Sequence, residues 1–308
     1  MQIYLPIADL PVNMFLILGM GLAVGFISGM FGIGGGFLMT PLLIFVGITP
    51  AVAVASVASH IAASSFSGAI NYWRRRTIDI SLALMLLIGG FTGTAGGVWL
   101  FSKLRALDQL DLVIGLSYVT LLSVVGGLMI HESVRAILRA RKGQPAVPRR
   151  PGSHAWFHGL PYKMRFKRSK IYVSVIPVLV IGFIIGFIGA IMGIGGGFLL
   201  VPMLIYLLRV PTSTVIGTSM VLTLVTMASA TVLHAATNHL VDAVLALILM
   251  VGGVIGAQFG ARTGQKMSGE RLRLMLGALV FAVGLRFAYE LIVRPDALYS
   301  IRIISGGA

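Results

Sequence analysis

The stretch GMFGIGGGFLMTPLLI, residues 29–44, decides how this chain folds, because it places a cluster of glycines inside a long apolar run. Glycine in a helix interior is about 1 kcal/mol less favourable than alanine. Gly32, Gly34, Gly35 and Gly36 therefore predict that a helix is interrupted here. A broken helix leaves backbone N–H and C=O groups unpaired, which a membrane tolerates only where the break is buried in protein or lines a cavity.

The same arrangement returns in AIMGIGGGFLLVPMLI, residues 190–205. Aligned at an offset of 161, residues 25–44 and 186–205 are identical at 13 of 20 positions. Internal repeats in a membrane protein are typical of transporters and channels built from two like halves. A duplication that serves structure alone is the alternative.

The composition is that of a polytopic membrane protein. Of 308 residues, 57% are hydrophobic and only 11% are charged, where a soluble domain carries about 25% charged residues. We expect an all-α fold of two homologous halves with four apolar blocks each, the first block of each half being broken or re-entrant. The blocks are 12–46, 51–72, 78–101, 110–130, 171–208, 214–236, 243–262 and 272–293.

Charge divides the chain into three predicted parts: an N-terminal transmembrane repeat (1–130), a basic loop (131–170) and a C-terminal transmembrane repeat (171–308). The loop holds 11 Lys and Arg residues and one acid, Glu132, and it carries most of the net charge of +15. In a membrane protein this excess marks the cytoplasmic side, so we expect no nucleic-acid partner. Residues 163–170 could also lie on anionic membrane lipid.

The short loops favour inverted halves. If each long first block turns back at its glycines, eight Lys and Arg of the short loops lie on the cytoplasmic side and four on the other. If each block crosses once, the tally is five and seven. We therefore expect inverted repeats in a bacterial plasma (inner) membrane, with the basic loop in the cytoplasm. The N-terminus has no Lys or Arg before residue 14, so the first apolar run is treated as part of the mature fold.

Each glycine cluster is followed by a stretch that can begin a helix. A helix N-terminus carries roughly half a positive charge and binds anions, and glycine lets an oxyanion approach the backbone closely. The predicted substrate-binding residues at the two breaks are Gly34, Gly35, Gly36, Phe37, Gly195, Gly196, Gly197 and Phe198. The alternative is that these glycines only allow close helix packing, as expected of GFTGTAGG and GALVFAVG.

The paired motifs GMFGIGGGFLMTP and AIMGIGGGFLLVP, with VIGTSM at residues 215–220, resemble the TauE/SafE sulfite exporter family. The resemblance covers nearly the whole chain except the basic loop. It implies secondary transport of small sulfur-containing or organic anions, such as sulfite or a sulfonate, and it implies no cofactor. One departure is ASVAS at 55–59, where the second half has IGTSM.

The second block of each half is rich in hydroxyl side chains that could donate hydrogen bonds to an anion. We select the residues nearest the aligned breaks, Ser56, Ser59, Thr218 and Ser219, although serine and threonine also bond to the preceding helical turn. His60 is an ionisable residue inside an apolar block, which makes it a candidate for anion binding or proton coupling. A neutral structural histidine is the alternative there, and it is the expectation for His234.

Other charged and ligating residues have simpler interpretations. Asp79 and Asp242 open their blocks and are expected to be N-caps. Arg286 and Glu290 lie four residues apart and are expected to pair structurally. The spacing of HAWFH, residues 154–158, would allow two imidazoles to hold a metal, but a third ligand is missing.

The leading function is therefore secondary transport of a small anion, most directly sulfite or an organosulfonate in the direction of export. An anion channel is one alternative, and a membrane scaffold whose basic loop recruits partners is another. An enzyme is not expected, because the chain has no cysteine, no HExxH motif and no membrane-facing acid pair. The sequence leaves a homo-oligomer open.

Overall fold

The computed structural model describes residues 2–31, 34–74, 76–141, 161–166, 168–169, 171–208, 210, 212–264 and 269–292. The first half contains α1 (Met14–Phe31), α2 (Gly36–Phe45), α3 (Pro50–Arg74), α4 (Ile80–Ala106) and α5 (Leu110–Arg141). The second contains α6 (Val175–Met192), α7 (Gly197–Tyr206), α8 (Thr212–Leu233), the π-helical turn η1 (His234–Asn238), α9 (Ala243–Gly264) and α10 (Gly269–Ile292).

The helices confirm an integral membrane protein with several spans. Seven of the described helices are long and apolar enough to cross a membrane. The eighth predicted block corresponds to α10, whose described apolar part, Leu274–Tyr289, is shorter than a full span. The predicted interruption is confirmed in both long blocks, since α1 and α2 are separate helices and so are α6 and α7.

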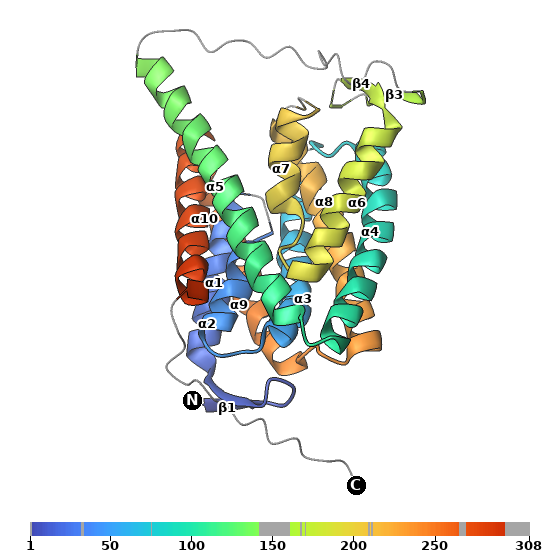
Figure 1. Cartoon of the computed structure of the whole chain (residues 1–308). Helices are drawn as coiled ribbons and strands as arrows, with labels where there is room; N and C mark the ends of the chain where they lie inside the picture. The colour runs from blue at the N-terminus through green and yellow to red at the C-terminus, as the bar shows by residue number, and fades with distance from the viewer. Residues whose placement is uncertain are drawn as a thin grey trace.

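Two short β-hairpins precede the halves and were not predicted. Strands β1 (Gln2–Leu5) and β2 (Leu10–Asn13) form one antiparallel pair, and β3 (Lys163–Phe166) and β4 (Ile171–Ser174) form the other. They lie at opposite ends of the helical bundle (Figure 1). From there α1 and α6 run into the bundle, and α2 and α7 turn back toward the end from which each began (Figure 1).

The segment 131–170 differs from the predicted loop at its start. Helix α5 continues to Arg141, so residues 131–141 are helical. The sequence HESVRAILRAR explains this, because it is rich in the good helix formers Ala, Leu, Arg and Glu. Residues 142–160, including the two histidines of HAWFH, lie outside the described part of the chain.

Helices from different halves pack through glycine. Helix α1 packs along α9, and α6 packs along α4. A Cβ atom at Gly25 would lie 2.3 Å from the Gly253 carbonyl oxygen, and one at Gly93 would lie 2.1 Å from the Phe183 carbonyl oxygen. Neither contact could accommodate a side chain, which confirms that the GFTGTAGG stretch serves close packing.

Both predicted N-caps are confirmed, and each also fastens a hairpin. The Asp79 carboxylate accepts a hydrogen bond from the Leu82 N–H at 3.2 Å and two from the N–H and hydroxyl of Ser169 at 2.8 Å. Asp242 caps α9 and accepts a bond from the Ile7 N–H at 2.9 Å. The turn of each hairpin is thus tied to the start of a helix in the other half.

Candidate functional site: two helix breaks that meet

The backbone at both breaks adopts a conformation that favours glycine. Gly35 caps α2 with φ 69°, and Gly196 caps α7 with φ 47°. Positive φ values also occur at Gly34, Gly193 and Gly195. A side chain strains the backbone in this region, so the glycine clusters are what allow the chain to reverse here.

The two breaks touch each other in the interior. A Cβ atom at Gly36 would lie 2.5 Å from the Gly193 carbonyl oxygen and 2.7 Å from that of Ile194. One at Gly34 would lie 3.2 Å from the Gly195 carbonyl oxygen. Backbone therefore meets backbone across the two halves, and only residues without a side chain fit between them.

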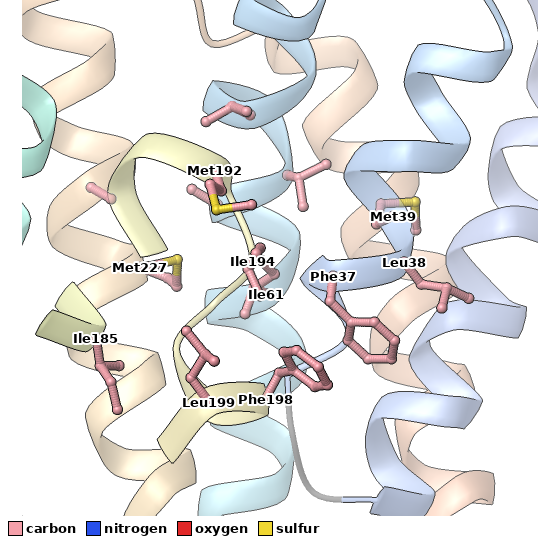
Figure 2. Close-up of a cluster of buried hydrophobic side chains, with 14 of the residues drawn as sticks. Phe37, Leu38, Met39, Ile61, Ile185, Met192, Ile194, Phe198, Leu199 and Met227 are labelled. Carbon is pink, nitrogen blue, oxygen red and sulfur yellow. The ribbon is translucent and has the colours of Figure 1, made fainter. Parts of the chain in front are cut away.

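The first turns of α2 and α7 converge at this contact. Phe37 and Phe198 are the second residues of their helices, and their rings stack with centroids 4.9 Å apart and an interplanar angle of 20°. Figure 2 shows the two rings side by side at the starts of the helices. The structure thus brings together the eight predicted break residues, Gly34, Gly35, Gly36, Phe37, Gly195, Gly196, Gly197 and Phe198.

Both breaks are enclosed by protein. Residues 34–41 and 189–200 are buried throughout. Hydroxyl groups cover carbonyl oxygens of the second break: Thr40 donates to Gly193 at 3.3 Å, Thr223 to Gly195 at 3.1 Å and Tyr118 to Met192 at 2.7 Å. This meets the requirement that irregular backbone at membrane depth be paired within the protein.

Two of these hydroxyl residues, Thr40 and Tyr118, were missed by sequence reasoning. Thr40 lies four residues beyond Gly36, the last glycine of the cluster, and directly before Pro41, so its position in the motif was a usable signal. Tyr118 lies in α5, far from either motif, and stacks on Phe287 of α10 with ring centroids 5.2 Å apart. Nothing in the spacing of the sequence relates it to the break.

The walls beside the break come from α3 and α8 and differ in polarity. The side chain of Ile61 in α3 would lie 2.6 Å from a Cβ atom at Gly195. The methyl group of Thr223 in α8 would lie 3.1 Å from one at Gly34, while its hydroxyl bonds to the break. One wall is therefore apolar and the other carries a hydrogen-bonding group.

Ser56 and Thr218 link the halves. The hydroxyl oxygen of Ser56 accepts a hydrogen bond from the Asp242 N–H at 3.0 Å, and that of Thr218 accepts one from the Asp79 N–H at 3.3 Å. Each bond joins the middle helix of one half to the start of a helix in the other. A role of these hydroxyls in substrate binding stays a prediction.

Ser59 and Ser219 bond to their own helices. The Ser59 hydroxyl donates to the Ser56 carbonyl at 2.6 Å, and the Ser219 hydroxyl donates to the Ile216 carbonyl at 2.8 Å. Both bonds reach back three residues, which is the pattern by which serine satisfies itself in a membrane helix. Their selection as binding residues also stays a prediction.

His60 is completely buried between helices of both halves. Its Nδ1 lies 2.7 Å from the Leu249 carbonyl oxygen in α9, and its ring fills the space beside Gly253, where a Cβ atom would lie 2.1 Å from Cε1. A carbonyl only accepts, so Nδ1 carries a proton, and in the neutral ring Nε2 is then an acceptor. Within the described residues Nε2 has no hydrogen-bond partner.

His234 matches the structural interpretation. Its Nε2 donates to the Ala190 carbonyl at 3.2 Å, and its Nδ1 accepts from the Asn238 amide at 3.3 Å. Asn238 in turn accepts a hydrogen bond from the Ser102 hydroxyl at 2.9 Å. Both ring nitrogens are therefore paired. This series of hydrogen bonds holds the last turn of α6, just before the second break, in place.

Comparison with known proteins identifies the family of this chain. The family model described as "Sulfite exporter TauE/SafE" matches residues 17–287, which include both glycine breaks. The chain belongs to the TauE/SafE family. Its match to the Bacillus subtilis "Probable membrane transporter protein YunE" is 28% identical and covers 88% of this chain and 96% of that protein. No solved structure matches it significantly.

Further relatives place this TauE/SafE chain among transporters rather than enzymes. A "Probable membrane transporter protein" of Xylella fastidiosa is 30% identical over 89% of this chain and 94% of its own length. The Arabidopsis thaliana "Sulfite exporter TauE/SafE family protein 1" is 42% identical over 28% of this chain and 19% of its own length.

Within the described residues, no group of three His, Asp or Glu side chains could hold a metal ion.

The remaining charged candidate lies in α10. Arg286 lies over the rings of Phe45 and Tyr289, at 5.3 and 5.7 Å from their centroids. Its expected partner Glu290 has a side chain outside the described part, so that pair stays a prediction. The contact with Phe45 places Arg286 against the end of α2, the short helix that starts at the first break.

Proposed function

We propose that this protein is a secondary transporter of small anions, with sulfite or an organosulfonate as substrate and export as its direction. The anion is held between the N-termini of α2 and α7. The observation that carries this proposal is the convergence of the two helix starts, marked by the stacked rings of Phe37 and Phe198.

The physical reason is the charge of a helix end. Each N-terminus carries roughly half a positive charge, and here two of them approach each other in a buried interior, where charges are weakly screened. An anion between them would be attracted by both ends. Glycines at the break would let its oxygens reach backbone N–H groups that a Cβ atom would otherwise cover.

The surrounding residues supply a second layer around this site. Thr223 already lies on the break, and Ser56, Ser59, Thr218 and Ser219 are the hydroxyls that would be recruited if α3 and α8 shift. His60 Nε2 is an acceptor that would take up a proton or face a protonated substrate. The name of the Arabidopsis relative, a sulfite exporter family protein, supports sulfite as the first substrate to test.

The mechanism we propose is alternating access by two inverted halves. In its support, α1 packs on α9 as α6 packs on α4, and the hairpins that precede α1 and α6 lie at opposite ends (Figure 1). The bonds from Ser56 to Asp242 and from Thr218 to Asp79 connect the halves at matching places. They are the contacts that would break and re-form as access alternates.

The test is uptake of radiolabelled sulfite into proteoliposomes, with unlabelled sulfonates, sulfate and carboxylates as competitors. We expect saturable flux that a subset of these anions blocks and that Gly35→Leu abolishes. Non-saturating flux would instead indicate a channel. Absence of flux for sulfite and for every labelled competitor, from protein with normal thermal unfolding, would reject transport. Deletion of part of residues 143–165, chosen to end before β3, should leave flux largely intact, whereas a scaffold would lose its function.

A further inference from the structure

A surface pocket lies beside the β3–β4 hairpin, away from the glycine breaks. It has a volume of about 190 Å³ and is lined by Trp73, Arg76, Ile78, Ile80 and Arg168. These residues come from the end of α3, the turn before α4, the first residue of α4 and the turn of the hairpin. Trp73, Ile78 and Ile80 supply its apolar lining, and Arg76 and Arg168, here called the rim, supply two guanidinium groups.

The hairpin turn is fixed against the turn between α3 and α4. Nη1 of Arg168 donates to the carbonyl oxygens of Arg76 at 2.8 Å and Ile78 at 2.9 Å. The neighbouring Ser169 is bonded twice to Asp79. These contacts hold the charged rim in place, and both Arg168 bonds come from one nitrogen of a group with five N–H donors.

The carboxylate of Asp79, which follows Ile78 in the chain, is hydrogen-bonded to groups other than the two arginines. Asp79 is 3% exposed and directs its oxygens to the N–H of Leu82 and to Ser169. Arg76 and Arg168 are both exposed. The pocket therefore presents two positive charges next to an exposed indole, that of Trp73, which suits the level of lipid headgroups.

Apolar side chains lead away from the pocket along both helices. On α3, Trp73 is followed toward the membrane interior by the exposed Ile70 and Phe66, spaced three and four residues apart. On α4, Ile80 is followed by the exposed Leu84 and Ile88, each four residues further. Residues at these spacings lie on one face of a helix. The positive rim is thus continuous with two apolar stripes.

We propose that this pocket binds the headgroup of an anionic phospholipid. The phosphate would lie between Arg76 and Arg168, and the acyl chains would lie along the stripes of α3 and α4. A free phosphate would use only the rim, whereas the stripes match the apolar part of an amphiphile. Basic pockets at the ends of membrane helices are suited to such headgroups.

The test is native mass spectrometry of the full chain in detergent, titrated with phosphatidylglycerol or phosphatidylcholine. The variant Arg76→Asn removes one charge and keeps a residue that tolerates the positive φ of 55° at this position. We expect the wild type to retain phosphatidylglycerol and Arg76→Asn to bind it at least about tenfold more weakly. The matched control Arg165→Gln removes an exposed charge from the same hairpin outside the pocket and should bind normally.

A second variant, Trp73→Leu, changes a lining side chain that is 62% exposed, and it should also weaken retention. Equal binding of both lipids, or equal loss in Arg76→Asn and Arg165→Gln, would overturn the proposal. So would full displacement of the lipid by inorganic phosphate or glycerol phosphate, which would indicate a site for the free anion. This test does not depend on transport, so its outcome is separate from that of the flux assay.

Discussion

At the scale of single residues, the break depends on positions where a methyl group cannot fit. In Gly36→Ala, the new Cβ atom would lie 2.2 Å from Ile61 Cδ1 and 2.5 Å from the Gly193 carbonyl oxygen. We expect this substitution to destabilise the protein by about 1–3 kcal/mol and to reduce anion flux strongly, because it forces the two breaks apart. Thermal unfolding in detergent and flux in proteoliposomes measure the two effects.

Gly19→Ala is the matched control for this substitution. Gly19 lies in α1, and nothing lies within 4 Å of a Cβ atom there. The same change should therefore leave flux normal and stabilise the helix by up to about 1 kcal/mol. Wild-type flux and unfolding temperature in Gly36→Ala would show that contact between the breaks is dispensable.

His60 allows its two nitrogens to be tested separately. The side-chain amide of asparagine can replace Nδ1 as the donor to the Leu249 carbonyl, but it supplies nothing at the position of Nε2. We expect His60→Asn to unfold near the wild-type temperature and to lose most flux. His60→Leu, which loses the hydrogen bond as well, should be less stable by about 1–3 kcal/mol. Normal flux in His60→Asn would assign His60 a structural role only.

At the scale of elements, the sequence predicted what depends on local composition. The glycine clusters indicated both breaks, because glycine has a low helix propensity and the apolar residues on either side have higher ones. The hairpins were missed because β1–β2 and β3–β4 are only four residues per strand and share almost no identity with each other. They are recognised by their tertiary contacts, the bonds from Ile7 and Ser169 to the two aspartates.

The candidate site was predicted only in part, because some of its residues are defined by tertiary contacts and not by local sequence. Its glycines and phenylalanines lie within one motif, so proximity along the chain indicated them. Tyr118 reaches the break from α5, and Thr218 pairs with a helix start in the other half. Such contacts depend on how helices pack in three dimensions, and helical spacing alone does not specify the partner helix.

Substitution of a capping aspartate measures how much its hydrogen bonds to the helix start and to the hairpin contribute to stability. In Asp79→Asn, an amide group replaces one acceptor and faces the N–H donors that Asp79 now binds, so donors oppose donors. We expect a loss of stability of about 1–3 kcal/mol, measured by thermal unfolding. The exposed Asp108 serves as the control, and Asp108→Asn should change stability by less than about 0.5 kcal/mol. Equal effects of the two substitutions would contradict this role of the cap.

At the scale of the whole molecule, the hairpins define the two ends of the bundle. Gln2 and Lys163 hold equivalent places in β1 and β3, which have the same pattern of exposed and buried residues. If the halves are inverted, these two positions face opposite sides of the membrane. The chain contains no cysteine, so a single introduced thiol would report its own side without interference.

We expect Gln2→Cys to react with a membrane-impermeant maleimide on intact cells, and Lys163→Cys to react only after the cells are permeabilised. The reason is that the basic segment next to β3 favours the cytoplasm, while residues 1–13, which contain β1, have no Lys or Arg. Total labelling in detergent controls for expression and for the reactivity of each thiol. Reaction of both positions from the same side would contradict the inverted arrangement, and with it the alternating-access mechanism, while leaving the contact between the two glycine breaks in place.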